Sequence, residues 1–142
     1  MAGRWRDERG SAAVEIALLA PILGALVLVV IFGGRLALVR QSVQAAASDA
    51  ARAASIARTA SLAERSAKQI AHQTMTNQGV KCASSSIDVD TSGFAQPVGE
   101  PASTTVTVVC SVATADLTLP LPGSTRVSAT SSSELDVYRE RR

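Results

Sequence analysis

A single carboxylate, Glu15, stands at the head of a long apolar segment that runs from Ile16 to Gly34. An ionised carboxylate is costly beside a low-dielectric region unless a cation neutralises it or its side chain reaches water. Two kinds of chemistry therefore suit Glu15: pairing with a positive group at the same depth, or extending to an aqueous interface.

The other candidate residues are few. One histidine, His72, and two cysteines are too small an inventory for a His-rich metal site or a His-based catalytic site. The stretch "DVDTSG", from Asp88 to Gly93, is similar to the start of a calcium loop, but the glutamate that such a loop needs comes one residue late, at Glu100. We expect no enzymatic activity, no metal, no cofactor and no small-molecule substrate. A net charge of +2 predicts no nucleic-acid partner.

The apolar segment from Ile16 to Gly34 predicts a membrane-spanning helix. Its 19 residues would extend about 28 Å at 1.5 Å per residue, close to the hydrocarbon thickness of a bilayer. Only 3% of the chain is aromatic, too little to enclose such a helix in a core. A cleaved secretory signal peptide is the alternative, but the segment exceeds the usual length of about 7–15 residues.

The orientation of the span follows from its flanks and from the cysteines. Three arginines precede the span and two follow it, which slightly favours a cytoplasmic N-terminus. Cys82 and Cys110 both lie in the C-terminal part, and a pair of cysteines suits an oxidising exterior. We expect the long C-terminal part to lie outside the cytoplasm.

Beyond the span the sequence keeps a helical period. Apolar residues recur at alternating intervals of three and four, a seam that needs a packing partner. A stop signal follows at Asn77-Gln78-Gly79. We expect one helix from about Ser11 to Gln78, about 100 Å long, whose seam packs on the chain's own domain, on other subunits, or on both. The seam residues are Leu36, Val39, Val43, Ala46, Ala50, Ala53, Ala57 and Ala60.

After Gly79 the period changes to two, which predicts three or four antiparallel strands. About 60 residues form a marginal core alone, so the sheet needs the helix and a second support. A Cys82–Cys110 disulfide would contribute about 3–4 kcal/mol. A buried free thiol at Cys110 is the alternative.

The stretch "RGSAAVEIALLAPIL" resembles the processing site of type IV prepilins, and more specifically the TadE-like pseudopilins of tight-adherence (Flp) pili. Ile16 stands where that family usually has an aromatic residue. The resemblance implies cleavage after Gly10 by a prepilin peptidase. It also implies a free amine on Ser11 that pairs, during assembly, with Glu15 of a neighbouring subunit.

The resemblance further implies an α+β, pilin-like fold and a place in the cytoplasmic (inner) membrane or in the pilus. The function would be that of a minor pilin in assembling the pilus or a related secretion apparatus. Its partners would be the major pilin, other pseudopilins, the pilus platform and the assembly ATPase. The alternative is a membrane-anchored extracellular binding module unrelated to pili.

The expected regions are a cytoplasmic leader (1–10), a transmembrane helix (11–34), an extracellular alanine-rich helix (35–78), an antiparallel β domain (79–138) and a charged tail (139–142).

Overall fold

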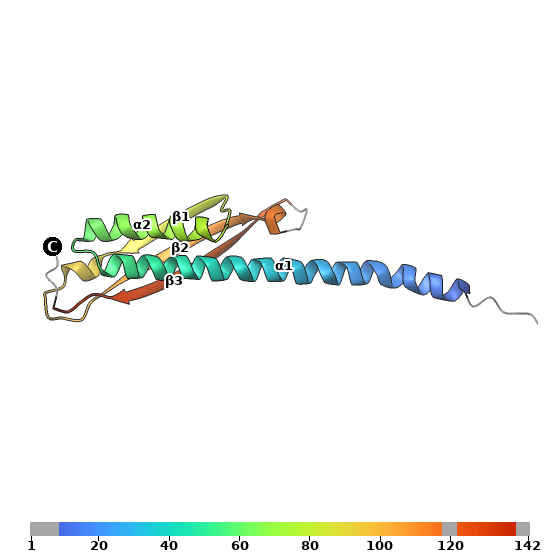
Figure 1. Cartoon of the computed structure of the whole chain (residues 1–142), viewed down its shortest axis with the longest axis horizontal. Coiled ribbons are helices and arrows are strands. Elements are labelled where there is room, and N and C mark those ends of the chain that lie inside the picture. Colours follow the sequence, from blue (N-terminus) through green and yellow to red (C-terminus); the bar gives the residue numbers. More distant parts are fainter. Residues whose placement is uncertain (1–8, 118–121, 139–142) are drawn as a thin grey trace, which may run out of the picture.

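In the described part of the chain, two helices pack with one antiparallel sheet, which confirms the expected α+β class (Figure 1). The computed structural model describes residues 9–117 and 122–138, with only the backbone described for residues 9–13. Most of the expected leader, residues 1–8, and the expected tail, residues 139–142, lie outside the described part. The elements are α1 (Arg9–Ser55), α2 (Ala60–Asn77), β1 (Ser84–Asp90), the 3-10 turn η1 (Ser92–Ala95), β2 (Ser103–Ala113), the 3-10 turn η2 (Thr114–Leu117) and β3 (Ser124–Glu134).

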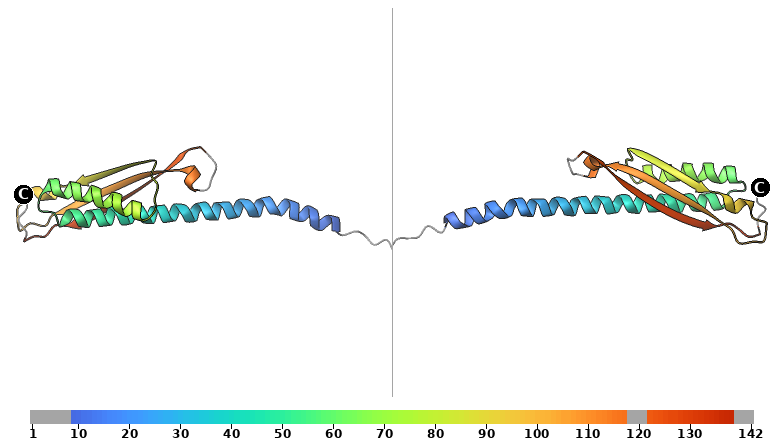
Figure 2. Two further views of the ribbon diagram at one scale, coloured as in Figure 1. Left: turned by 45° about the horizontal axis from the view of Figure 1, so that its top comes forward. Right: turned by 180° about the vertical axis from the view of Figure 1, so that it is seen from behind.

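The first helix, α1, is bare over its N-terminal half and packed over its C-terminal half. Its 47 residues correspond to about 70 Å at 1.5 Å per residue. Figure 2 shows the N-terminal half extending alone, away from α2 and the sheet. Ser42 and Val43 are the first buried side chains along the helix. The same helix therefore meets two different environments in succession.

The expectation of one helix as far as Gln78 is wrong, because the helix breaks after Ser55. Thr59 adopts an extended backbone, and its hydroxyl oxygen accepts a hydrogen bond from the backbone N–H of Leu62 at 3.2 Å. This is an N-cap, which satisfies one of the unpaired donors at the start of α2. A straight helix would leave its alanine-rich face in water, whereas the break lets α2 fold back along α1.

The two helices pack through alanine on both sides. The buried residues of α1 include Ala46, Ala47 and Ala50, and those of α2 include Ala63 and Ala67; all are fully buried. Alanine costs no side-chain entropy and allows helix backbones to approach closely. The alanine period continues beyond Ser55 because the second helix buries an alanine face of its own.

The end of α2 follows the sequence expectation. Gly79 has a positive φ of 69°, which glycine adopts without steric cost. The N–H of Val80 donates to the carbonyl of Met75, and the N–H of Gly79 donates to that of Thr76, each at 3.0 Å. These two bonds form a Schellman motif. The stop predicted at Gly79 is confirmed, and it directs the chain into β1.

The sheet has the order β1-β2-β3, with both neighbouring pairs antiparallel. The strand β2 alternates strictly: Thr104, Val106, Val108, Cys110 and Val112 are buried, while the residues between them are partly exposed. The buried face packs against α1, which lies over β2 and β3. Hydroxyl pairs join strands across the outer face, as between Thr105 and Ser132 (Oγ1 to Oγ, 2.8 Å). One face of the sheet therefore forms the core, and the other face is exposed to solvent.

A disulfide joins Cys82, just before β1, to Cys110 in the middle of β2, with the two Cα atoms 5.4 Å apart. Cys110 is fully buried. The Sγ atom of Cys82 also lies 4.0 Å from the Sδ atom of Met75, near the end of α2. The bond therefore fastens the segment between α2 and β1 to the central strand, consistent with the pairing expected from the sequence.

The N-cap of α2 yields a first prediction. We expect Thr59→Ala to lower the free energy of unfolding by about 1 kcal/mol, because the N–H of Leu62 loses its acceptor. Thr59→Ser keeps an oxygen at the same position and should stay close to the wild type. Urea unfolding of the full chain in detergent micelles, followed by circular dichroism, measures both. Equal losses in the two variants would contradict this role of the hydroxyl.

The disulfide yields a second prediction. Replacing both cysteines (Cys82→Ser with Cys110→Ala) should cost about 3–4 kcal/mol, because the unfolded chain regains the entropy of a 28-residue loop. A reducing agent should lower the urea midpoint of the wild type and leave that of the double variant unchanged. An unchanged wild-type midpoint after complete reduction would contradict the stabilising role of the bond.

Candidate functional site

The candidate processing residues lie at the beginning of α1. The described helix begins at Arg9, so the backbones of Gly10 and Ser11 belong to its first turn. Glu15 lies four residues beyond Ser11, about 6 Å further along the helix axis. Helical side chains lean toward the N-terminus, which directs Glu15 back over the turn that contains Ser11. The backbone thus places both residues on one face.

The carboxylate of Glu15 is exposed and has no hydrogen-bond or ion-pair partner among the described side chains, those of residues 14–117 and 122–138. The side chains that follow it are apolar and bare: Ile16 is 67% exposed and Val29 is 66% exposed. No part of the described domain covers this surface (Figure 2). Within the described side chains, Glu15 is therefore an unpaired carboxylate at the start of the apolar stretch from Ile16 to Gly34.

The bare half of α1 is long and apolar enough to cross a membrane. An 18-residue window within Val14–Ser55 has a mean hydropathy of 2.8, and none of that window is buried. A buried core helix would show the opposite, since its apolar side chains would be covered. The glycines of this half, Gly24, Gly33 and Gly34, have nothing within 4 Å of an added Cβ atom, so no contact with the described residues requires them.

The seam predicted from Leu36 to Ala60 is directed toward the chain's own domain. Val43, Ala46 and Ala50 are fully buried, while the remaining members are half-buried. The buried stripe is wider than the seam, because Ala47 and Ala54 are fully buried as well. The chain therefore covers most of this face itself, and most of the bare apolar surface of α1 lies before Leu36.

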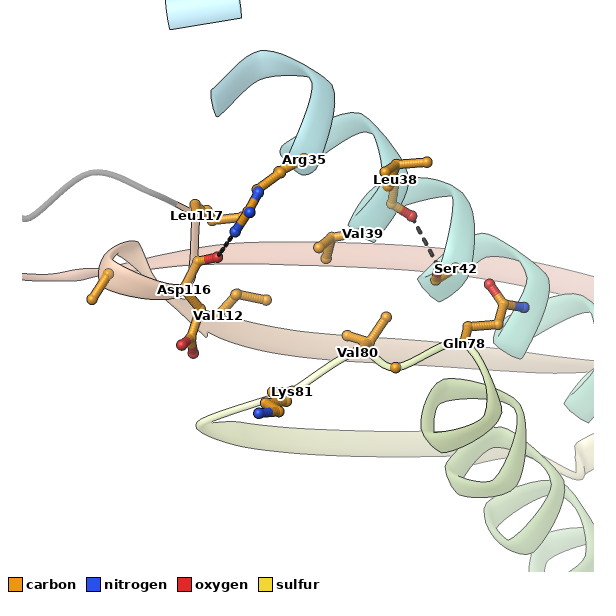
Figure 3. A pocket seen from close by; sticks show the side chains of 12 residues that line it. Arg35, Leu38, Val39, Ser42, Gln78, Val80, Lys81, Val112, Asp116 and Leu117 are labelled. Atoms are coloured by element: carbon orange, nitrogen blue, oxygen red, sulfur yellow. Dashed lines mark hydrogen bonds between the residues drawn. The ribbon is translucent and has the colours of Figure 1, made fainter. Parts of the chain in front are cut away.

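A cavity of about 500 Å³ opens where α1 meets the domain (Figure 3). Arg35 lies at its edge and donates a hydrogen bond from Nη1 to the backbone carbonyl oxygen of Asp116, in η2, at 3.1 Å. Lys81 faces it from the segment between α2 and β1. The sequence analysis did not single out this site. The available signal was a basic residue directly after the apolar segment.

The other polar residues considered from the sequence, in the Asp88–Gly93 stretch and at His72, form no described catalytic or metal-binding site. The N–H of Ser92 donates to Oδ1 of Asp90 at 2.9 Å, and this hydrogen bond lowers the pKa of the Asp90 carboxyl below its usual value. His72 is exposed on α2. Within the described residues, no three His, Cys, Asp or Glu side chains are grouped so that they could hold a metal ion.

Comparison with known proteins gives one match. The family model described as TadE-like protein matches residues 10–52, from the candidate cleavage glycine almost to the end of α1. No curated protein and no solved structure matches the chain. The matched family is pilus-associated and of a structural, non-enzymatic kind. The chain is thus TadE-like over residues 10–52, which confirms the resemblance carried by its N-terminal sequence.

Proposed function

We propose that the protein is a minor pseudopilin of a tight-adherence pilus or a related secretion apparatus. The observation that carries this proposal is the exposed carboxylate of Glu15, which no described side chain pairs, at the head of a bare apolar helix inside the TadE-like match. In this role the chain is a structural component, and the enzyme at its N-terminus is a partner, a prepilin peptidase.

Cleavage after Gly10 would convert the start of α1 into an assembly element. It removes a leader with three arginines and leaves a positively charged amine on Ser11, at the cytoplasmic edge of the membrane. An uncompensated charge costs about 2.5–3.5 kcal/mol at the centre of the bilayer on insertion scales, and less toward its edge. The amine of one subunit and Glu15 of its neighbour would neutralise each other, and the apolar surfaces of their helices would then pack together.

The orientation follows from the same proposal. The N-terminus lies in the cytoplasm, where the peptidase and the assembly ATPase act, and the disulfide-bonded domain lies outside the cytoplasm. The span then brings the chain to the membrane platform, the other pseudopilins and the major pilin. The domain covers its own helix seam, so the bare span before Leu36 is the surface left for helix–helix contacts between subunits.

Processing at Gly10 is the third prediction. The mature chain should begin at Ser11 in cells that contain the peptidase and keep its leader in cells that lack it. Gly10→Val should block cleavage, because a side chain at this position obstructs the scissile bond. Gly24→Ala is the matched control, since an added Cβ atom there meets nothing within 4 Å. The measurement is the intact mass of the membrane-extracted protein together with N-terminal sequencing.

An uncleaved chain in both strains would contradict the proposal and leave a membrane-anchored extracellular module. If both glycine variants blocked cleavage, the effect would belong to the helix in general rather than to the scissile position.

The role of Glu15 is the fourth prediction. Glu15→Gln should still be processed to Ser11 but should reduce recovery in sheared pili by about tenfold, because about half of the 2.5–3.5 kcal/mol cost of a charge at the bilayer centre corresponds to about tenfold in an equilibrium. Glu134→Gln removes the same charge from an exposed strand end and should leave recovery unchanged. Normal assembly of Glu15→Gln would contradict the pairing role and favour a carboxylate that only reaches water.

A further inference from the structure

The cavity beside Arg35 combines positive charge with apolar walls. Its basic side chains, Arg35 and Lys81, come from segments far apart in the sequence. Apolar side chains from α1, from the segment after α2, and from β2 and η2 form much of the remaining wall; they are Leu38, Val39, Val80, Val112 and Leu117. Such a lining suits a ligand with an anionic head and an apolar body.

The side chains of Arg35 and Lys81 both have N–H donors that no described residue accepts. A guanidinium carries five N–H donors, and the described residues accept only from Nη1 of Arg35. Lys81 is exposed, and its ammonium has no partner in the described ranges 9–117 and 122–138. The carboxylate of Asp116 forms no ion pair with either cation there and lies on the side away from Arg35 in Figure 3. With that carboxylate included, the lining still carries a net charge of +1.

The position of the cavity along α1 is set by the apolar span. Gly34 is the last residue of the apolar segment, and Arg35 is the first charged residue after it. The wall formed by α1 continues to Ser42, about 10 Å further along the axis. The headgroup layer of a bilayer is about 5–8 Å thick on each side. With α1 in the membrane, the cavity therefore lies at the depth of the lipid headgroups.

We propose that this cavity binds the headgroup of an anionic membrane phospholipid. Arg35 and Lys81 would bind the phosphate, which a guanidinium recognises through paired N–H bonds. Leu38, which is 64% exposed, and Val39 would contact the glycerol and the first methylenes of the acyl chains. The lipid would fix the height of the domain above the membrane. This proposal depends on the membrane span alone and not on the pilus function.

The test uses the full chain in vesicles of phosphatidylcholine that contain a minor share of phosphatidylglycerol. Native mass spectrometry of the released protein counts the lipids of each kind that stay bound. We expect the wild type to retain one phosphatidylglycerol, and Lys81→Gln to reduce the preference over phosphatidylcholine about fivefold, the effect of about 1 kcal/mol per basic residue. Lys81 has no described partner to lose, so this variant should fold normally.

The matched control is Arg40→Gln, which removes a positive charge five residues beyond Arg35 from an exposed position that does not line the cavity. It should keep the preference for phosphatidylglycerol. Equal losses in Arg40→Gln and Lys81→Gln would overturn the proposal in favour of diffuse surface charge. Displacement of the lipid by excess inorganic phosphate would overturn it in favour of a free-anion site. A lower dimer fraction in Lys81→Gln with unchanged lipid preference would make the occupant a second copy of the chain.

Discussion

The constraint on which this structure depends is that one unbroken helix serves two environments. From Ile16 to Ile31 the large apolar side chains of α1 are all exposed, whereas from Ser42 its inward face becomes small and buried. A helix can make this change because its backbone groups bond within the helix and need nothing from their surroundings. The change falls between Arg35 and Ser42, where the domain begins (Figure 1). Everything beyond that point is arranged around the small face.

A face made of alanine sets limits on the domain. Each alanine buries little area, so the stability per residue is low and close approach of the backbones has to compensate. Close approach also appears at η1, where a Cβ atom on Gly93 would collide with the carbonyl oxygen of Ser103. Large buried side chains, such as Leu117, are few. A domain built in this way gains much from a covalent tie such as Cys82–Cys110.

The sequence alone predicted the elements whose signals are local. The apolar span, the alternation of β2 and the stop at Gly79 depend on neighbouring residues, and the structure contains all three. The helical period of the sequence did not reveal the break before Thr59. Both helices bury alanines at similar spacing, so the period of three and four runs on across the break. The cavity could not be predicted, since Arg35 and Lys81, which both line it, lie far apart in the sequence.

Opposite charges lie at the two ends of the span. Glu15 and Arg35 are 20 residues apart, about 30 Å along a helix, which equals the hydrocarbon thickness of a bilayer. Both charges can therefore reach a headgroup layer at once, and a shift of α1 along its axis would desolvate one of them. In a fibre neither layer exists. Glu15 would then need a cation from another subunit, and Arg35 would have to exchange lipid phosphate for protein or water. The two proposed contacts therefore belong to successive states of one helix. The lipid contact at Arg35 forms while the helix lies in the membrane, and the pairing at Glu15 forms in the assembly that leaves the membrane.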